Sequence, residues 1–327
     1  MRVSEIGERR LVELILSRME PMEGSLGFWE DASAFPMQGG VMVVCSVDTL
    51  VWKTDVPPGM TERMAGAKAV TMAVSDLAAK GVRPVAVMTS ISIPSSWDVE
   101  TVLELMEGVN EAARSYGAHV LGGDTNESPE PSITCVALGT CRRGEFIPRS
   151  GARPGDVLAT TGTFGETAAG LKILLEGLDA PAELRGELLR AVYYPRARVE
   201  EGVKLAETGA ATASIDSSDG LAMSLHDLSR SSNVGFLLEE LPTSRLAEEF
   251  ASIHGLSVEE LVLYGGEEFE IVCCLRPDGA EEARKALREV GCDLRFIGRV
   301  VEKPGVWLLA DGEKKPIPPR GWEHFRR

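Results

Sequence analysis

The hydrophobic positions of the first 140 residues alternate between a helical and a strand-like period. Apolar residues recur at helical spacing from Ser4 to Met19, and the alanine-rich run "TERMAGAKAVTMAVSDLAAKG" predicts a helix that stops at Gly81. A third helix is predicted from Asp98 to Tyr116. Strands are predicted at "VMVVCSV", "VAVMTSISI", "HVL" and "SITCVALGT". These elements indicate a mixed α/β unit.

A break follows at "RRGEFIPRSGARPGD", which carries three glycines, two prolines and four arginines and has no hydrophobic period. We place a domain boundary there, which gives an N-terminal domain of residues 1–148 and a C-terminal domain of residues 149–327. A chain of 327 residues exceeds the size at which one hydrophobic core keeps growing. Two domains are therefore expected.

The second half repeats the α/β alternation. Its predicted strands are "VLATTGT", "TASID", "VGFLLE", "FEIVCCL", "LRFIGRV" and "GVWLLA". Its predicted helices include "ETAAGLKILLEG", two more before "TASID", one from Leu221, helical segments up to Leu263, and one from Asp278 to Val290. The sequence as a whole predicts two α/β (α+β) domains of similar size.

The composition argues against some classes of binding partner. The chain has 50 Asp and Glu against 34 Lys and Arg, a formal net charge of −16. Such a surface repels nucleic-acid backbones and anionic membranes, so neither is expected as a partner. A phosphate substrate would need cations or backbone amides between itself and the acidic groups. The charged, amphipathic N-terminus predicts neither a signal peptide nor a membrane span.

The six cysteines show no C-x-x-C spacing, and most lie in apolar runs such as "VVCSV" and "EIVCCL". This pattern is typical of buried thiols in a reducing compartment, so a cytoplasmic protein is expected. Several common catalytic motifs are absent from the sequence: the Walker A loop, the G-x-G-x-x-G fingerprint, H-E-x-x-H, and the G-x-S-x-G elbow.

Aspartates are the remaining candidates for chemistry, because several stand where a strand-like run stops. They are Asp31, Asp48, Asp76, Asp124 and the pair Asp216 and Asp219 in "SIDSSDG". Ligands of α/β sheets bind at strand ends, and carboxylates without nearby histidine or cysteine suit hard cations such as Mg²⁺. Each aspartate alone also fits a turn or a helix cap, and Asp219 would cap a helix from Leu221. The residues leave both interpretations open.

Three further stretches have two readings each. "GTFGETAAG" is either a simple turn or a helix N-terminus whose amides face a phosphate. Arg149 in "PRSGARPGD" is either a phosphate clamp or a solvated charge, and "YGGEEFE" is either a solvated turn or part of a site.

Taken in order and spacing, these segments resemble the thiamine-monophosphate kinase family. The resemblance rests on "WEDASAF", "SVDTLV", "SDLAAKG", "LGGDTNE", "PRSGARPGD", "TGTFGETAAGL", "IDSSDGL", "YGGEEFE" and "GWEHF", and it runs from about Gly27 to Phe325. The superfamily includes aminoimidazole ribonucleotide synthetase and selenophosphate synthetase. "TDVPPGMT" and "GGDTNE" are similar to the archaeal branch of the kinases.

The resemblance implies an N-terminal domain whose sheet pairs with that of a partner into a β-barrel across a homodimer, and a C-terminal α/β domain that completes the cleft. It also implies ATP, several Mg²⁺ ions, and transfer of a phosphoryl group to thiamine monophosphate. By position, it implies magnesium ligands at Asp31, Ser46, Asp48, Asp76, Asp124, Asp216 and Asp219. It implies ATP contacts at Tyr116, Gly123, Asp124, Arg149 and Ser218, and substrate contacts at Asp55, Glu267 and Trp322. The residues implied in catalysis are Asp48, Asp124, Asp216 and Arg149.

The chain departs from the family pattern at three positions. Glu30 replaces the first of two paired aspartates, Val47 stands where a threonine is frequent, and Asp55 aligns with a substrate-side histidine of the bacterial enzymes. Two alternatives follow: another ATP-using enzyme of the superfamily, or a nucleotide- or thiamine-binding paralogue without turnover. A selenophosphate synthetase would need a reactive residue in a glycine-rich loop, whereas Cys45 lies in a strand-like run.

Overall fold

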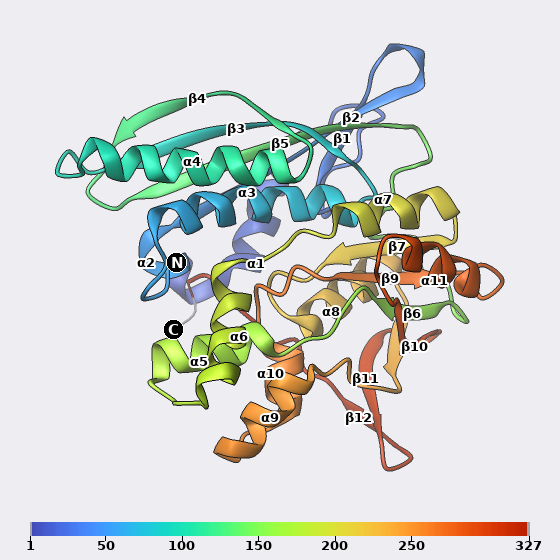
Figure 1. Cartoon of the computed structure of the whole chain (residues 1–327). Coiled ribbons are helices and arrows are strands. Elements are labelled where there is room, and N and C mark those ends of the chain that lie inside the picture. Colours follow the sequence, from blue (N-terminus) through green and yellow to red (C-terminus); the bar gives the residue numbers. More distant parts are fainter. Residues whose placement is uncertain (1, 326–327) are drawn as a thin grey trace.

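The computed structural model describes residues 2–325, which form two α/β units, each built on its own sheet (Figure 1). The first sheet has the strand order β1-β2-β5-β3-β4. Its strands are β1 (Ser33–Pro36), β2 (Val41–Val51), β3 (Pro84–Ile93), β4 (His119–Glu127) and β5 (Ser132–Arg142). All neighbours in it are antiparallel except β3 and β4, which are parallel.

Two long helices, α3 (Glu62–Ala79) and α4 (Val99–Ser115), cover one face of this sheet (Figure 1). The alternation along β2 explains why: Met42, Val44 and Leu50 are buried beneath the helices, whereas Val47 on the other face is 63% exposed. Glycines let the two helices approach closely, because a Cβ at Gly108 would meet the carbonyl oxygen of Arg63 at 1.9 Å. The short helices of this part are α2 (Trp52–Asp55) and the 3₁₀ turn η1 (Gln38–Gly40).

The second sheet has the order β12-β11-β8-β10-β6-β9-β7. Its strands are β6 (Val157–Thr160), β7 (Ala211–Asp216), β8 (Gly235–Leu238), β9 (Ile271–Leu275), β10 (Arg295–Val301), β11 (Gly305–Ala310) and β12 (Glu313–Pro316). Its helices are α5 (Glu166–Glu176), α6 (Ala182–Tyr193), α7 (Val199–Thr208), α8 (Leu221–Ser232), α9 (Arg245–His254), α10 (Val258–Tyr264) and α11 (Ala280–Glu289). The fully apolar pattern of β8 and β9 reflects burial of these central strands on both faces.

Helix α3 joins the two parts of the molecule. Near its C-terminal end, the ammonium of Lys80 donates to the carbonyl of Ser214 in β7 at 2.7 Å. The backbone of Ala78 approaches α7 so closely that a Cβ at Gly202 would lie 1.9 Å from its carbonyl oxygen. The carboxyl end of β7 is thereby held against α3, and this contact positions the site described below.

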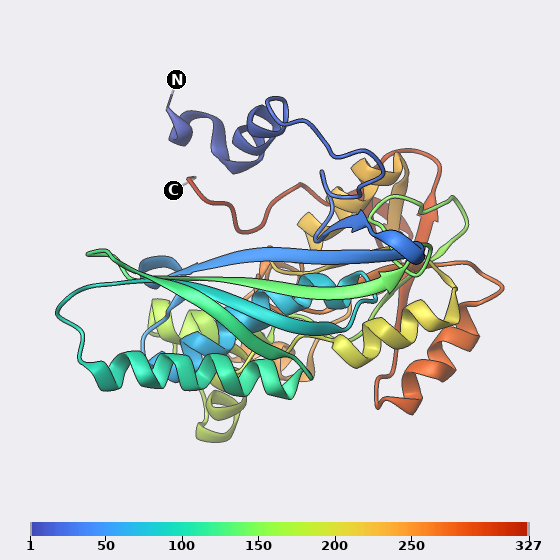
Figure 2. The same cartoon turned by 90° about the horizontal axis from the view of Figure 1, so that it is seen from above.

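The two ends of the described chain also meet. The backbone amide of Glu8, in α1 (Val3–Leu16), donates to Glu323 Oε1 at 3.1 Å, and the amide of His324 donates to Glu8 Oε2 at 3.0 Å. Both views show the N-terminal helix beside the C-terminal segment (Figures 1 and 2). Arg9 extends this contact with a bidentate hydrogen-bonded ion pair to Asp227 of α8.

The predicted α/β class and most predicted elements are confirmed. The helix predicted at 98–116 is α4, and the strand predicted at "SITCVALGT" is β5. The N-terminal helix ends at Leu16, three residues earlier than predicted, and the strand begun by "HVL" continues to Glu127. Strands β1 and β12 and helix α2 were not predicted. The domain boundary after residue 148 stays a prediction.

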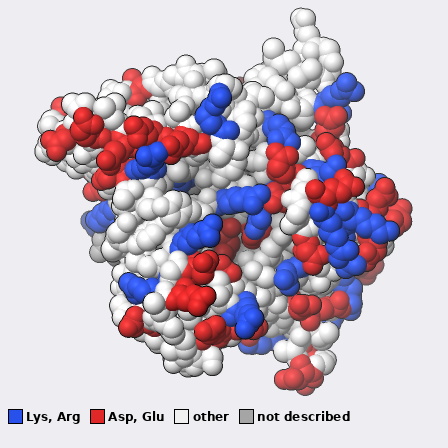
Figure 3. All heavy atoms as spheres, in the orientation of Figure 1, with Lys and Arg blue, Asp and Glu red and all other residues white. Residues whose placement is uncertain are grey.

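The surface carries many acidic side chains, as expected from the composition (Figure 3). Acidic side chains gather in a band where α4 lies (Figures 1 and 3), and the exposed members on that helix are Glu100, Glu104, Glu107 and Glu111. Arg63 of α3 pairs with Glu107 at 3.5 Å and with Glu111. Among the described residues, no helix combines the length and the hydropathy needed to cross a bilayer.

Candidate active site

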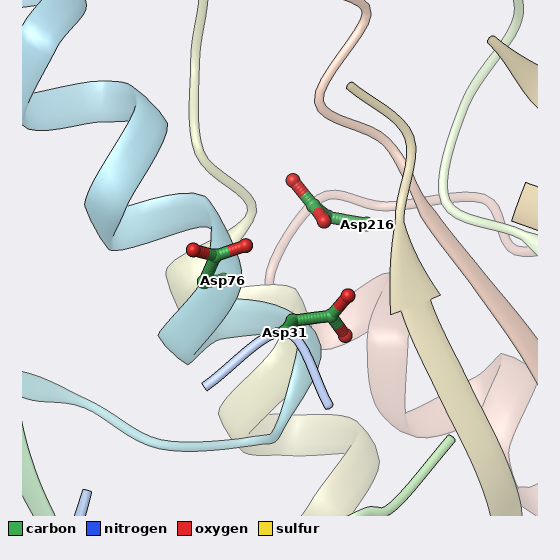
Figure 4. Close-up of side chains that lie close together, drawn as sticks. All are labelled: Asp31, Asp76 and Asp216. Carbon is green, nitrogen blue, oxygen red and sulfur yellow. The ribbon is translucent and has the colours of Figure 1, made fainter. Parts of the chain in front are cut away.

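Three of the predicted aspartates come together from three different parts of the chain. Asp31 precedes β1, Asp76 lies in α3, and Asp216 ends β7. Each offers a carboxylate oxygen such that all three oxygens lie within 4.8 Å of one another. Figure 4 shows the three carboxyl groups around one common space. We call these residues the carboxylate cluster.

Two cations, of which Lys80 is fully buried, neutralise one member of the cluster. The ammonium of Lys80 lies 2.6 Å from Asp31 Oδ2, and Arg149 donates to Asp31 Oδ1 through Nε at 2.7 Å and through a second, shorter contact. Burial alone would raise the pKa of Asp31, but Arg149 and Lys80 hold that pKa below its ordinary value. Asp31 is therefore ionised and fixed in place.

The other carboxyl groups lack such partners and repel one another. Burial, followed by the charges of Asp48 and Asp216, raises the pKa of Asp76 well above its ordinary value. Burial and the charge of Asp31 raise the pKa of Asp216 to about 7. Asp48, which shares a side-chain hydrogen bond with Asp76, also has a raised pKa, chiefly because it is buried. The site carries more negative charge than its own cations balance.

This donor set fits a magnesium site. Closely spaced carboxylates from separate elements are the ligands that Mg²⁺ prefers, and a cation between them would relieve the repulsion that raises these pKa values. Ser75 supports the arrangement, because its hydroxyl donates to Asp216 Oδ2 at 2.8 Å and thereby orients that carboxylate.

A cavity of about 600 Å³ opens from the cluster, within the usual range for small-ligand sites. Its walls include Asp48, Asp76 and Asp216 from the acidic end. Three residues predicted to contact substrate also line it, namely Asp55, Glu267 and Trp322, together with Ser218 and Asp219. The cavity therefore extends from the acidic residues to a wall that includes the indole of Trp322, which is 51% exposed.

The structure contradicts the interpretation of Asp219, in "SIDSSDG", as a helix cap. Helix α8 does begin at Leu221, but its N-cap is Gly220, at φ 106°, and no side chain caps it. The prediction of Asp219 as N-cap is wrong, because the turn needs a left-handed residue at the cap position. Instead, Asp219 faces the cavity, where burial raises its pKa to about 6.

Several predicted site residues lie away from the carboxylate cluster. Asp124 and Gly123 are exposed on β4, where the Nδ2 of Asn126 donates to Asp124 Oδ2 at 2.7 Å. A Cβ at Gly123 would lie 2.1 Å from the carbonyl oxygen of Thr89, so strand pairing itself requires glycine there. The hydroxyl of Ser46 donates to the carbonyl of Ala73 at 2.8 Å.

Tyr116 and Glu30 have partners within the fold. The hydroxyl of Tyr116 lies 3.0 Å from Thr71 Oγ1 and accepts from the amide of Ala197 at 3.0 Å, so it ties α3 to the segment before α7. Glu30 accepts from the amide of Arg149 at 2.8 Å and from Lys80 at 3.2 Å. Glu30 thus anchors the two cations that hold Asp31.

The glycine-rich turn before α5 already binds a carboxyl group of the protein itself. Glu268 Oε1 accepts from the amides of Gly165 at 2.7 Å and Thr167 at 3.3 Å. This carboxyl group therefore binds the backbone amides that one interpretation of "GTFGETAAG" assigned to a phosphate. Burial raises the pKa of Glu268 to about 8.

Sequence reasoning missed the two buried lysines of the site. Lys68 and Lys80 are 1% and 0% exposed, and both lie in the run that predicted α3. Lysine is rarely buried unless it is paired, and both lysines stand beside alanines in this run. A lysine on the buried face of an alanine-rich helix was therefore the available signal. Glu8, which reaches the cavity from the N-terminal helix, left no comparable signal.

Models of known protein families match most of this chain. Residues 29–141 match the sequence model of the AIR synthase related protein, N-terminal domain, and residues 153–309 match that of the C-terminal domain. The thiamine-monophosphate kinase of Nitrosopumilus maritimus is 35% identical over 91% of this chain and 93% of its own length. That of Pyrococcus abyssi is 35% identical over 99% of this chain and 97% of its own length. The chain belongs to the thiamine-monophosphate kinase family.

Solved structures share the fold of this chain. The structure of AaThiL complexed with AMPPCP and TMP has a TM-score of 0.87 and 28% identity, and covers 99% of both chains. Protein tt0281 from Thermus thermophilus also gives a TM-score of 0.87, with 33% identity over 97% of this chain and 100% of its own. The family's two-domain α/β architecture is thus the architecture of this chain.

Proposed function

We propose that this protein transfers the γ-phosphoryl group of ATP to thiamine monophosphate and forms thiamine diphosphate. The observation that carries the proposal is the carboxylate cluster at one end of a cavity whose other walls include Glu267 and Trp322. The family relatives are named for this activity, and AaThiL is described in complex with AMPPCP and TMP. The function is thus a kinase with a phosphate acceptor.

Asp31, Asp76 and Asp216 would hold Mg²⁺, with Asp48 and Asp219 as further acidic groups at the cavity wall. When bound, Mg²⁺ would neutralise charge on the phosphates and on the transferring group. Ser46 and Asp124 stay proposed ligands on the strength of the family resemblance alone. The same holds for ATP contacts at Tyr116, Gly123 and Ser218.

In this scheme, the role of Arg149 is to fix the position and the charge of Asp31. It holds Asp31 in its ionised form from one side, while Lys80 holds it from the other. Because the second phosphate pKa is about 6, the acceptor phosphate is largely ionised near neutral pH, and no side chain has to deprotonate it. The chain's own contribution is then to orient ligands and to exclude water, and we propose direct in-line transfer without a phosphorylated enzyme.

The structure weakens the selenophosphate synthetase alternative. Cys45 lies within β2, and burial raises the pKa of its thiol, which opposes formation of a reactive thiolate. A paralogue without turnover would bind ligands and release no ADP.

We also propose a homodimer in which the uncovered face of the N-terminal sheet meets its counterpart. That face carries exposed apolar side chains, namely Val47, Val85, Met88 and Leu121, at 63%, 52%, 42% and 65% exposure. Seen from above, β2, β5 and β3 lie in view without a described helix over them (Figure 2). A contiguous exposed apolar face on a strand surface is typical of a protein–protein interface.

A steady-state assay with ATP, Mg²⁺ and thiamine monophosphate, in which thiamine diphosphate is measured directly, tests the activity. We expect product formation that depends on Mg²⁺ and stops on its removal by chelation. Absence of product over a wide range of Mg²⁺ concentrations, with ligand binding intact, would favour the paralogue without turnover.

A further inference from the structure

Lys68 is a buried cation that the proposed mechanism does not yet use. It lies on α3, is 1% exposed, and belongs to the wall of the cavity. Its ammonium donates to the carbonyl of Asp55 at 2.8 Å and lies 2.5 Å from Glu267 Oε1. One lysine therefore joins α2 and the segment 264–270, both of which carry residues proposed to contact substrate.

The position of Lys68 on α3 relates it to the carboxylate cluster. Lys68, Met72 and Asp76 follow one another at a spacing of four residues and all line the cavity. Asp76 lies two turns farther along the helix, about 12 Å away at the backbone by the helical rise. The same face of one rigid helix thus presents a carboxylate to the cation-binding end and a cation to Glu267.

The partner of Lys68 has an unusual backbone. Glu267 and Phe269 have φ values of 63° and 51°, in the left-handed region that non-glycine residues rarely adopt. The amide of Glu267 donates to the carbonyl of Ser218 at 2.6 Å, and that of Phe269 to the carbonyl of Ser217 at 2.9 Å. Such a conformation persists only where the surroundings hold it, and strained residues of this kind cluster at ligand sites.

We infer that Lys68 is a positioning residue for substrate recognition, which acts by holding the carboxylate of Glu267 toward the cavity. The side chain of Glu267 is 27% exposed, so ligands can reach it, whereas the ammonium of Lys68 lies behind it. A carboxylate fixed in this way suits the cationic thiamine part of the substrate, not its phosphate. This inference rests on the proposed function for the identity of the ligand.

The alternative is that Lys68 contacts the substrate phosphate directly. The burial of its ammonium argues against this, because a phosphate could reach it only after Glu267 moved away. The two roles differ in a measurable way. A phosphate contact would not affect the binding of thiamine itself, whereas loss of the held carboxylate would weaken thiamine and thiamine monophosphate alike.

The test is a double-mutant cycle on the full-length protein, with Lys68→Met, Glu267→Gln and the double variant. Dissociation constants for thiamine and thiamine monophosphate are measured by calorimetry in the presence of Mg²⁺ and a non-hydrolysable ATP analogue. We expect Lys68→Met to weaken both ligands about ten-fold, and to have less than a two-fold effect when Glu267 is already glutamine. In steady state it should raise KM for thiamine monophosphate and leave kcat and KM for ATP near wild type.

Two results would overturn the inference: wild-type affinity for thiamine in Lys68→Met, or an undiminished effect of Lys68→Met in the Glu267→Gln background. Lys172→Met is the matched control, because Lys172 forms a 2.8 Å pair with Glu176 outside the cavity. If Lys68→Met does not fold, Lys68→Gln, which can still donate a hydrogen bond, should show a smaller loss in the same measurements. A wild-type protein that binds both ligands but makes no thiamine diphosphate would refute the proposed activity and leave this binding test intact.

Discussion

The surroundings of Asp216 in the folded protein disfavour the ionised form of its side chain. Its carboxylate is buried beside Asp31 and Asp76 and receives one hydrogen bond, from Ser75. The raised pKa expresses the free energy that the folded protein loses when this group ionises. Such a residue costs stability without metal and contributes to it with metal, which is typical of a functional position rather than a structural one.

We therefore predict that Asp216→Asn stabilises the metal-free protein and removes most of its response to Mg²⁺. The neutral amide relieves the repulsion with Asp31 and Asp76 but is a poorer ligand, so activity should fall by at least about 100-fold, roughly 3 kcal/mol in transition-state free energy. Thermal unfolding with and without saturating MgCl₂ checks the stability, and the assay for thiamine diphosphate checks the activity. Asp179→Asn, at a side chain that is 92% exposed, is the control. An unchanged Mg²⁺-induced shift in melting temperature would contradict this assignment.

Glu268 gives a second prediction, which concerns pH. Its pKa rises from 4.5 in the unfolded chain to about 8 in the folded protein, chiefly because it is buried. Between these two values the folded protein holds a proton that the unfolded chain has released. Its contribution to stability is therefore fully present below pH 4.5 and is lost as the pH rises to about 8, at no more than about 1.4 kcal/mol per pH unit.

Glu268→Gln should flatten this part of the stability curve. The amide oxygen can still accept from Gly165 and Thr167, so the fold around α5 is retained. Urea unfolding at several pH values from about 5 to about 9 measures the difference between wild type and variant, which should grow in favour of the variant with rising pH. A difference that stays constant with pH would show that Glu268 does not titrate in this interval.

At the scale of elements, α3 is the helix that connects the parts of the site. It presents Lys68 and Asp76 to the cavity, and Lys80 follows directly after its last residue. Its placement depends on α4, because Gly66 and Gly108 let the two helices come within contact of each other's backbone. Any change that separates α3 from α4 also displaces the cluster relative to β7.

Gly108→Ala tests this dependence. The added Cβ would lie 1.9 Å from the carbonyl oxygen of Arg63, so the helices must move apart, at a cost of about 1–3 kcal/mol that outweighs the helix propensity of alanine. We expect a lower free energy of unfolding and weaker Mg²⁺ binding.

Gly186→Ala is the matched control, because this glycine lies in α6 with nothing within 4 Å of an added Cβ. Alanine there should stabilise the protein by up to about 1 kcal/mol. Chemical denaturation of both variants measures the contrast. Equal stability of the two variants would mean that the contact between α3 and α4 tolerates expansion.

The elements with a long hydrophobic period were predictable, and those fixed by tertiary contact were not. β2 and α4 are indicated by their alternation and helical spacing. β1 is four residues long and has no hydrophobic period of its own, and its pairing with β2 and with Leu26 makes it a strand. For the same reason, the short strand β12, all of whose residues are exposed, carries no pattern of its own.

The site, too, was predictable only in part. Aspartates at strand ends pointed to Asp216, but nothing local indicates that Asp31, in the other half of the sequence, lies beside it. Of the two cations that pair with Asp31, Arg149 was predicted as a site residue, whereas the burial of Lys80 in the alanine-rich run was not recognised. The role of Ser46 as a ligand stays a prediction from its motif, and in the structure its hydroxyl donates to the carbonyl of Ala73 in α3.

At the scale of the whole molecule, the N-terminal sheet has one face that none of the described helices covers (Figure 2). α3 and α4 cover the other face, and the acidic band on α4 keeps the outer helical surface hydrated (Figure 3). The uncovered face instead presents Val47, Val85, Met88 and Leu121. An isologous dimer would bury this face on both copies, since a two-fold interface places the same patch against itself.

Leu121→Lys should therefore weaken the proposed dimer. Leu121 is 65% exposed and lies in β4, at the edge of the sheet, so lysine is accommodated in the monomer but would place two buried charges in the interface. Sedimentation velocity over a dilution series measures the result, and we expect at least a ten-fold higher dissociation constant. Leu103→Lys is the control, because Leu103 is 50% exposed on α4, which packs on the opposite face of the sheet. A monomeric wild-type protein, or equal effects of the two substitutions, would contradict the proposed dimer and would leave the apolar sheet face without this explanation.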